Sequence, residues 1–175
     1  CQQCAQSQWW FRHQKVLLSI KRTLSFFGIF NRIPKDGELP IPGNTKGGAD
    51  LIVSTSDLHF IDVKITAGTP DYAKYSWSCV KFNSTLSHYR EFEKQTKLKV
   101  IPFVVSIFGT VEPRTLEAIA PWFEQSPNPK LFRASLYLNL QFELMRTLHQ
   151  SLTLLRCRQL DVAAAPDAPA VVADT

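Results

Sequence analysis

Two aspartates and a lysine stand in a pattern that suits metal-assisted chemistry. Asp50 follows a glycine pair, and Asp62 and Lys64 lie two residues apart in an apolar segment downstream. Carboxylate oxygens are the ligands that Mg²⁺ prefers, and a nearby ammonium group can orient a water molecule. Hydrolysis of a phosphodiester bond is the reaction that suits such a set. The alternative for Asp62 and Lys64 alone is a surface ion pair.

A β-hairpin is the element that must bring these side chains together. Residues 51–65 contain two apolar segments separated by short polar residues, which are typical of a turn. Strand side chains alternate between two faces, so Asp62 and Lys64 share one face of the second strand, and its opposite face is apolar. We expect strand pairing to bring Asp50 close to Asp62.

The rest of the chain predicts one α/β domain with a central mixed β-sheet of about four strands flanked by helices. Apolar residues at helical spacing predict the helices, and β-branched runs predict the strands. The expected elements are a helix over 8–27 ended by Gly28, a strand over 29–34, the hairpin over 51–65, a helix ending near residue 96, a strand over 98–109, a helix over 113–123 and a C-terminal helix over 131–157. We expect the tail over 158–175 to be disordered.

Three of these elements carry more specific expectations. The strand over 98–109 is apolar on both faces and is therefore expected in the centre of the sheet, with a bulge or a strand start at Pro102. In the C-terminal helix, the spacing assigns one set of residues to the buried face, and a second apolar set indicates burial on another side, against a neighbouring domain. The first set is Leu138, Phe142, Met145, Leu148, Leu152 and Leu155, and the second is Leu136, Leu140 and Leu144.

Aromatic residues alternate with bases between residues 72 and 90. Such residues could stack on nucleic-acid bases and neutralise phosphates. The interpretation that we favour for most of them is that they form the buried side of a helix. Those residues are Tyr75, Trp77, Phe82 and Tyr89.

Several other residues are candidates for accessory roles. His13 ends the apolar stripe of the first helix, where it is either a half-buried core histidine or a contact to phosphate or water. Glu38 is either a third metal ligand or a solvated loop carboxylate. Lys74 and Lys81 are further candidate site lysines, and the candidate DNA-binding bases are Arg12, Lys15 and Lys46.

Composition and charge limit the class of protein. The 175 residues carry a formal net charge of +5, which favours an anionic partner, nucleic acid first, although a modest excess also serves solubility alone. The spacing of Cys1 and Cys4 is that of half a zinc site, or it is an incidental pair. The cysteine pattern does not resemble a disulfide framework, which favours an intracellular location. We expect no membrane-spanning segment and no small-molecule substrate.

The order of elements and the acidic hairpin resemble the PD-(D/E)XK nuclease superfamily. Asp50 matches the first motif acid, and residues 62–64 match the second motif, with Asp where many members have Glu. Arg12, His13 and Val16, shortly after the cysteine pair, resemble the start of the restriction-like endonuclease domain of site-specific non-LTR retrotransposons. The lysine-rich aromatic helix and the following Pro-Phe-Val-Val-Ser-x-Phe-Gly strand are also similar to that family. The resemblance covers about residues 1–123.

The resemblance implies a restriction-endonuclease-like core over 9–126, preceded by the end of a zinc knuckle over 1–8. It implies a DNA endonuclease that uses Mg²⁺ or Mn²⁺ held by Asp50, Asp62 and the carbonyl of Val63, with Lys64 as the catalytic lysine. In that family the lysine is often moved to the following helix, so Lys74 and Lys81 compete with Lys64. Zn²⁺ would belong to Cys1 and Cys4.

The resemblance also implies a longer polyprotein. The chain starts at Cys1, and we expect upstream domains that include a reverse transcriptase, with a nuclear location in a eukaryote. The DNA cut would then prime reverse transcription. Two alternatives stay open. One is a stand-alone Holliday-junction resolvase or restriction-type nuclease, and the other is a non-catalytic DNA-binding domain of the same fold.

Overall fold

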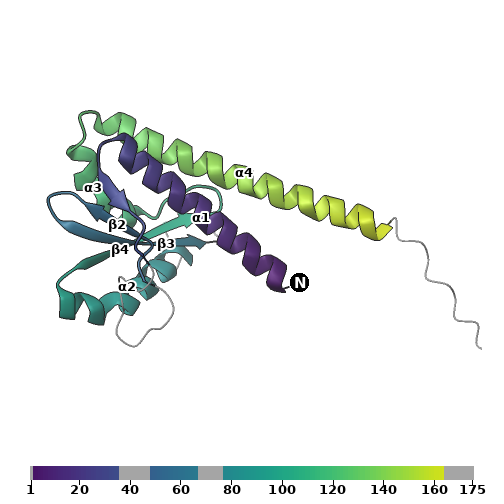
Figure 1. Ribbon diagram of the computed structural model, residues 1–175, viewed down its shortest axis with the longest axis horizontal. Helices are drawn as coiled ribbons and strands as arrows, with labels where there is room; N and C mark the ends of the chain where they lie inside the picture. The colour runs from purple at the N-terminus through teal and green to yellow at the C-terminus, as the bar shows by residue number, and fades with distance from the viewer. Residues whose placement is uncertain (1, 36–47, 67–76, 164–175) are drawn as a thin grey trace, which may run out of the picture.

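The chain folds around a four-stranded mixed β-sheet that is covered by helices on both faces (Figure 1). The computed structural model describes the backbone of residues 2–35, 48–66 and 77–163, and the side chains of residues 8–35, 48–66 and 77–154. The elements are α1 (Gln2–Phe26), β1 (Phe30–Arg32), β2 (Leu51–Ser54), β3 (Leu58–Thr66), α2 (Trp77–Thr96), β4 (Lys99–Ser106), α3 (Pro113–Glu124) and α4 (Pro129–Ala163).

The strands are ordered β1-β2-β3-β4. The first three pair antiparallel, and β4 pairs parallel to β3 after the crossover through α2. The prediction of an α/β chain with a four-stranded mixed sheet, flanking helices and a C-terminal helix is therefore confirmed. A parallel pair needs a long crossover connection, and α2 supplies it.

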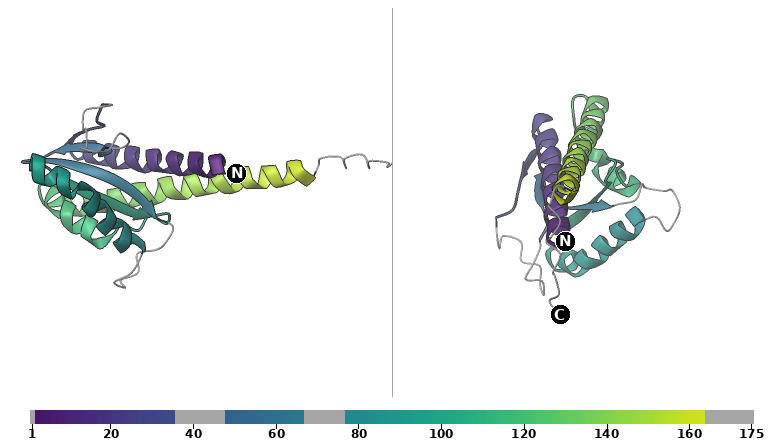
Figure 2. Two further views of the ribbon diagram at one scale, coloured as in Figure 1. Left: turned by 90° about the horizontal axis from the view of Figure 1, so that it is seen from below. Right: turned by 90° about the vertical axis from the view of Figure 1, so that its right-hand side faces the viewer.

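Helices α1, α3 and α4 lie over one face of the sheet, and α2 lies over the other (Figure 2). The larger core packs between the sheet and helices α1, α3 and α4. It includes Ile20, Val63, Phe103 and Leu140, all at most 1% exposed. A smaller apolar cluster packs between the sheet and α2 around Phe60 and Phe92 and also contains Tyr89.

Helix α1 ends where the sequence predicts. Gly28 has a φ of 76°, a left-handed conformation that glycine adopts without steric cost. The N–H groups of Gly28 and Ile29 donate to the carbonyls of Ser25 and Leu24, at 3.1 and 2.9 Å. This pair of bonds is the Schellman motif, which satisfies carbonyl groups at the end of a helix and turns the chain toward β1.

Strand β4 differs from the prediction in two ways. It lies at the edge of the four described strands instead of in the centre. It also runs through Pro102 without a bulge or a break, and Pro102 pairs with Asp62 in the continuous parallel register. The strand tolerates proline there because the backbone of Pro102 faces away from β3, as the bond from Thr115 to its carbonyl shows. Thr115 covers that outer side: its hydroxyl accepts from the N–H of Val104 at 3.2 Å and donates to the carbonyl of Pro102 at 2.7 Å. The N–H that proline lacks is therefore not needed for the β3–β4 ladder.

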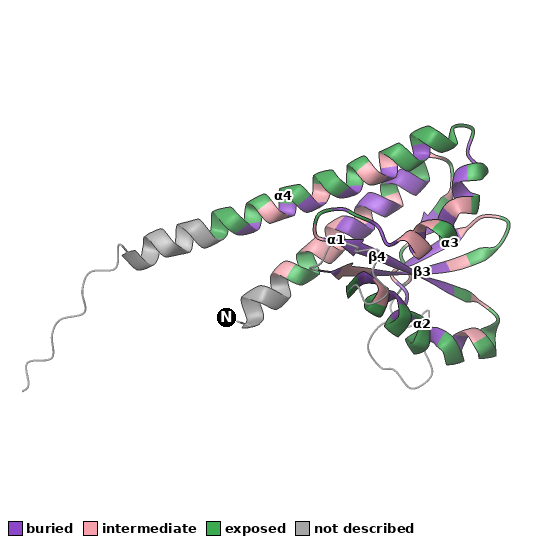
Figure 3. Cartoon of the chain, turned by 180° about the vertical axis from the view of Figure 1, so that it is seen from behind, coloured by how far each residue is buried: buried purple, intermediate pink, exposed green. Residues whose placement is uncertain are grey.

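Two further assignments are corrected. In α4, four of the residues predicted for the buried face are exposed, Leu138, Phe142, Met145 and Leu152, and Leu148 is half-buried. The side chain of Leu155 lies outside the described part. Leu136, Leu140 and Leu144 are instead the residues buried against the core, and Figure 3 shows that one side of α4 is buried and the other exposed. In α2, Phe82 and Tyr89 are buried as predicted, but Trp77 at the first position of the helix is 75% exposed. Tyr75 lies outside the described residues.

The boundaries of two helices also differ from the predicted ones. Helix α1 begins at Gln2, so the segment over 2–8 is continuous with it, and α4 continues to Ala163, into the predicted tail. Residues 164–175 lie outside the described part of the chain. None of the described helices is long and apolar enough to cross a membrane.

Candidate functional site

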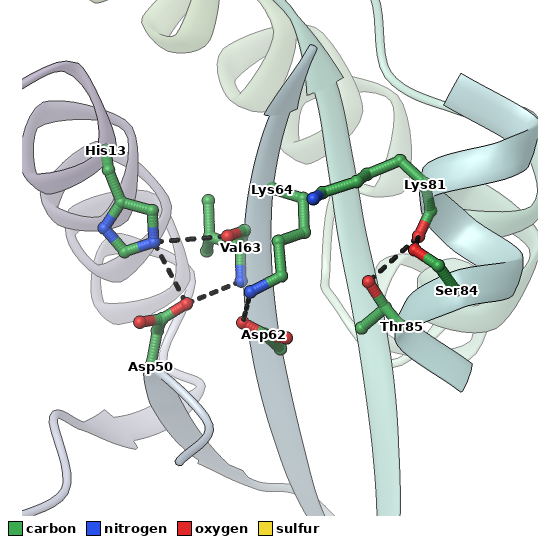
Figure 4. Close-up of polar contacts among 8 residues, drawn as sticks. All are labelled: His13, Asp50, Asp62, Val63, Lys64, Lys81, Ser84 and Thr85. Carbon is green, nitrogen blue, oxygen red and sulfur yellow. Dashed lines mark hydrogen bonds and ion pairs between the residues drawn. The ribbon is translucent and has the colours of Figure 1, made fainter. Parts of the chain in front are cut away.

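The β2–β3 hairpin places Asp50 close to Asp62. Asp50 directly precedes the first residue of β2, Leu51, which pairs with Ile61, and the N–H of Asp50 donates to the carbonyl of Ile61 at 2.7 Å. The two carboxyls are close enough for each to shift the pKa of the other. The proximity predicted from the hairpin is therefore present (Figure 4).

Asp50 is fixed by the backbone of β3 and by α1. Its Oδ2 accepts from the N–H of Val63 at 2.7 Å and lies 3.1 Å from Nε2 of His13. The same His13 nitrogen lies 3.2 Å from the carbonyl oxygen of Val63. One imidazole nitrogen of α1 therefore sits between two oxygen atoms of the hairpin, which gives His13 a direct part in the site.

These contacts shift the pKa values of both side chains. Burial alone would raise the pKa of Asp50, but the hydrogen bond from His13, its charge and the Val63 N–H bring it below the ordinary value. The hydrogen bond to Asp50 raises the pKa of His13, against the opposing effect of burial. Both shifts favour an ionised pair of carboxylate and imidazolium.

Asp62 is buried on the α2 side of the sheet, with 2% of its surface exposed. Its Oδ1 accepts from the Lys64 ammonium at 2.7 Å. Burial raises the pKa of Asp62 to about 6, and the Asp50 charge adds to this, although Lys64 acts in the opposite direction. Tyr89 of α2 also interacts with this carboxyl: burial, together with the charge and hydrogen bond of Asp62, raises the pKa of the Tyr89 phenol. Asp62 therefore changes protonation close to neutral pH.

A cavity of about 330 Å³ opens beside Asp62, between β3 and α2. Lys64 and Lys81 both line it, and Lys81 extends from α2 toward β3 (Figure 4). The structure thus brings two of the three candidate lysines into one space, with Lys64 in direct contact with Asp62. The lining residues are Gly48, Asp62, Lys64, Lys81, Ser84, Thr85, His88 and Tyr89.

Five of these residues were not predicted for the site, Gly48 and four residues of α2. Ser84, Thr85, His88 and Tyr89 follow Lys81 at spacings of three, four, seven and eight residues, which places them on one helix face. That spacing was a usable signal, but it does not show which face of α2 turns toward β3.

The hairpin carries oxygen atoms of the kinds that could hold a hard divalent cation. Mg²⁺ is commonly held by one or two carboxylates plus other oxygen atoms, and Asp50, Asp62 and the Val63 carbonyl provide such a set. Within the described residues there is no group of three or more His, Cys, Asp or Glu side chains that could hold a metal ion. Glu38, the predicted third carboxylate, lies outside that part of the chain.

Other predicted residues lie away from the hairpin or outside the described part. Arg12 donates to Ser151 of α4 at 3.1 Å and stacks over Trp9, and Lys15 lies over the ring of Phe11. The two bases therefore pack against neighbouring helical side chains. Lys46, Lys74 and Cys1 lie outside the described residues, and the side chain of Cys4 does too, although its backbone is part of α1.

Comparisons with protein-family models, with curated proteins and with solved structures found no match for this chain.

Proposed function

We propose that this chain is a metal-dependent DNA endonuclease domain with a restriction-endonuclease-like core, which nicks target DNA for a retrotransposon. One observation carries the proposal: the hairpin holds the carboxylates of Asp50 and Asp62 close enough to shift each other's pKa, with the Lys64 ammonium on Asp62. The Val63 carbonyl and Asp50 contact the same nitrogen of His13. The net positive charge supports a nucleic-acid partner. In this proposal the domain belongs to a longer polyprotein that acts inside the cell, in the nucleus of a eukaryote.

Asp50, Asp62 and the Val63 carbonyl would hold Mg²⁺ or Mn²⁺. When bound, such an ion supplies Lewis-acid polarisation of the phosphate and a more acidic water molecule. The raised pKa of Asp62 fits this role, because burial disfavours the ionised carboxylate, the charge of Asp50 adds to this, and a bound cation would stabilise the ionised form.

The lysines would act on the phosphate and on the attacking water. Lys64 already contacts Asp62, so its ammonium lies next to the proposed metal ligand. Lys81 approaches the same cavity from α2 and would meet a phosphate from the other side. Two cations around a cavity that contains an acid suit a phosphodiester, whose negative charge grows in the transition state.

The test is cleavage of supercoiled plasmid DNA by the purified chain in Mg²⁺ or Mn²⁺. We expect Asp62→Ala to lower the nicking rate at least ~1,000-fold, as loss of a metal-binding or electrostatic group does. Asp57→Ala, in the exposed turn of the same hairpin, is the matched control and should cut like the wild type. Equal nicking by Asp62→Ala and the wild type would remove Asp62 from the mechanism.

The same assay ranks the lysines. Lys64→Ala should lower the rate by ~100-fold or more, and Lys81→Ala should lower it less, because only Lys64 contacts Asp62. The opposite order would assign the catalytic lysine to α2.

A second candidate is a DNA-binding domain that does not cleave. It is favoured by the contacts that already engage the proposed ligands: His13 lies between Asp50 and the Val63 carbonyl, and Lys64 is bonded to Asp62. Titration of Mn²⁺ by calorimetry separates the two candidates. Binding that is lost in Asp62→Ala supports the nuclease, and DNA binding without metal binding supports the second candidate.

A further inference from the structure

Helix α4 carries apolar side chains on two opposite faces. One stripe, with Phe132, Leu136, Leu140 and Leu144, is buried in the core that α4 shares with α1. The opposite face is open along its length (Figure 3). Large apolar residues on that face keep half or more of their surface exposed: Leu131 50%, Leu138 64%, Phe142 67%, Met145 56% and Leu152 57%. An exposed apolar stripe of this length indicates an interaction surface.

The exposed residues follow a heptad repeat. Their positions, completed by the half-buried Ser135 and the exposed His149, alternate in steps of four and three residues along the helix. We call this set the outer seam: Leu131, Ser135, Leu138, Phe142, Met145, His149 and Leu152. Alternating steps of three and four residues place side chains along a line that winds slowly around a straight helix. A second helix that supercoils around the first covers such a line. The pattern therefore specifies an α-helix as the partner.

The charges beside the outer seam are compatible with self-association. In coiled coils, charged residues that flank the seam select the partner, and like charges exclude wrong ones. Among the described residues at those flanking positions of α4, one is charged, Arg146, and it is bonded to Glu143 of the same helix at 2.7 Å. No like charges would meet if two copies of α4 paired, and no charge pattern selects a different helix.

The length of the outer seam is sufficient for a weak dimer. From Leu131 to Leu152 it spans ~32 Å of helix. Two such helices in contact bury on the order of 1,200 Å² in total, at the lower end of the range for specific interfaces. The opposite stripe of α4 is occupied by the core.

We propose that the outer seam of α4 pairs with the outer seam of a second copy of this chain, in a two-helix coiled coil that makes the protein a homodimer. The contact is isologous, because the same residues of both copies form it. Given its size, we expect dissociation in the micromolar range.

Sedimentation equilibrium of the full chain tests the proposal. The protein concentration should run from ~1 to ~200 μM, a range that brackets the expected dissociation constant. The mass should rise from that of the 19.9 kDa monomer toward twice that value. The double variant Leu138→Glu/Phe142→Glu should stay monomeric and should weaken association at least 100-fold. Because both residues are exposed, circular dichroism and thermal unfolding should match the wild type.

Leu154→Glu is the matched control. Leu154 is 56% exposed on the same helix but is not one of the outer-seam residues. The Leu154→Glu variant should leave the dimer unchanged. A wild-type chain that remains monomeric at ~200 μM would overturn the proposal. A dimer that survives the double variant, or that Leu154→Glu disrupts equally, would place the interface elsewhere and would also overturn it.

Discussion

The two faces of the β-sheet are built differently. Under α1, α3 and α4 lies the large apolar core, whereas the face under α2 combines a small apolar cluster with Asp62, Lys64 and the cavity beside them. Burial of apolar surface stabilises a fold, and burial of charged groups costs free energy unless they are paired. This difference indicates that the stability of the domain comes mainly from the face under α1, α3 and α4. The face under α2 can therefore hold buried ionisable groups.

The largest expected effect comes from the core itself. Phe103→Ala removes a ring from the large core, where the side chain is 1% exposed, and should lower the free energy of unfolding by about 4 kcal/mol. Phe92→Ala, in the small cluster under α2, should cost about 2 kcal/mol, because the surroundings can relax toward the helix surface. Urea denaturation measures both. A larger loss for Phe92→Ala would contradict the division between the two faces.

At Asp62 we expect a smaller change in the free energy of unfolding, and in the stabilising direction. Its pKa in the folded chain, about 6, lies above the ordinary value of 3.8. Protonation therefore stabilises the fold fully below pH ~4, and this contribution is lost as the pH rises through 6. Asp62→Asn, which cannot ionise, should raise the free energy of unfolding by about 2 kcal/mol at pH 8 and by little near pH 4.

Thermal unfolding as a function of pH measures this effect. Asp57→Asn, in the exposed turn, is the control and should show no such pH dependence. If Asp62→Asn were less stable than the wild type at pH 8, the bond from Lys64 would outweigh the burial of the carboxylate. In that case the α2 face would contribute to stability through its charges.

The smallest expected effect concerns His13, which approaches the hairpin from the opposite face. The pKa of its imidazole is raised, chiefly by the hydrogen bond to Asp50. The protonated form stabilises the fold fully below pH ~6.5, and this contribution is lost as the pH rises through the folded-state pKa. NMR titration should give a midpoint above the ordinary value, and Asp50→Asn should lower it. An unchanged midpoint in Asp50→Asn would show that Asp50 does not raise the pKa of His13.

The hairpin could be predicted because its local signals agree. The polar turn, the alternating second strand and the glycine pair before Asp50 all specify one register, and this register brings Asp50 close to Asp62. Contacts from distant elements could not be predicted as reliably. The bond between His13 and Asp50 joins α1 to the hairpin, and the interaction of Tyr89 with Asp62 requires the orientation of α2 relative to β3.

The faces of α4 illustrate a second limit. Two apolar stripes run along this helix, and each has helical spacing, so periodicity alone cannot show which stripe meets the core. The stripe chosen from the sequence, with Leu138 and Phe142, is the exposed one, and Leu136 and Leu140 are buried. Packing against α1 decides between them. For the same reason, the apolar character of β4 reflects helices on both of its faces and not a central position in the sheet.

The hydroxyl of Thr115 has a consequence for assembly. An edge strand with open N–H and carbonyl groups is a template for strand addition, the first step of swapping and fibril growth. Thr115 occupies the N–H of Val104 and the carbonyl of Pro102, and Pro102 presents no N–H to an incoming strand. The backbone of Thr110 and Glu112 bonds Ser106 and Val104 of the same strand. The part of β4 from Pro102 to Ser106 is therefore closed to an incoming strand by groups of this chain.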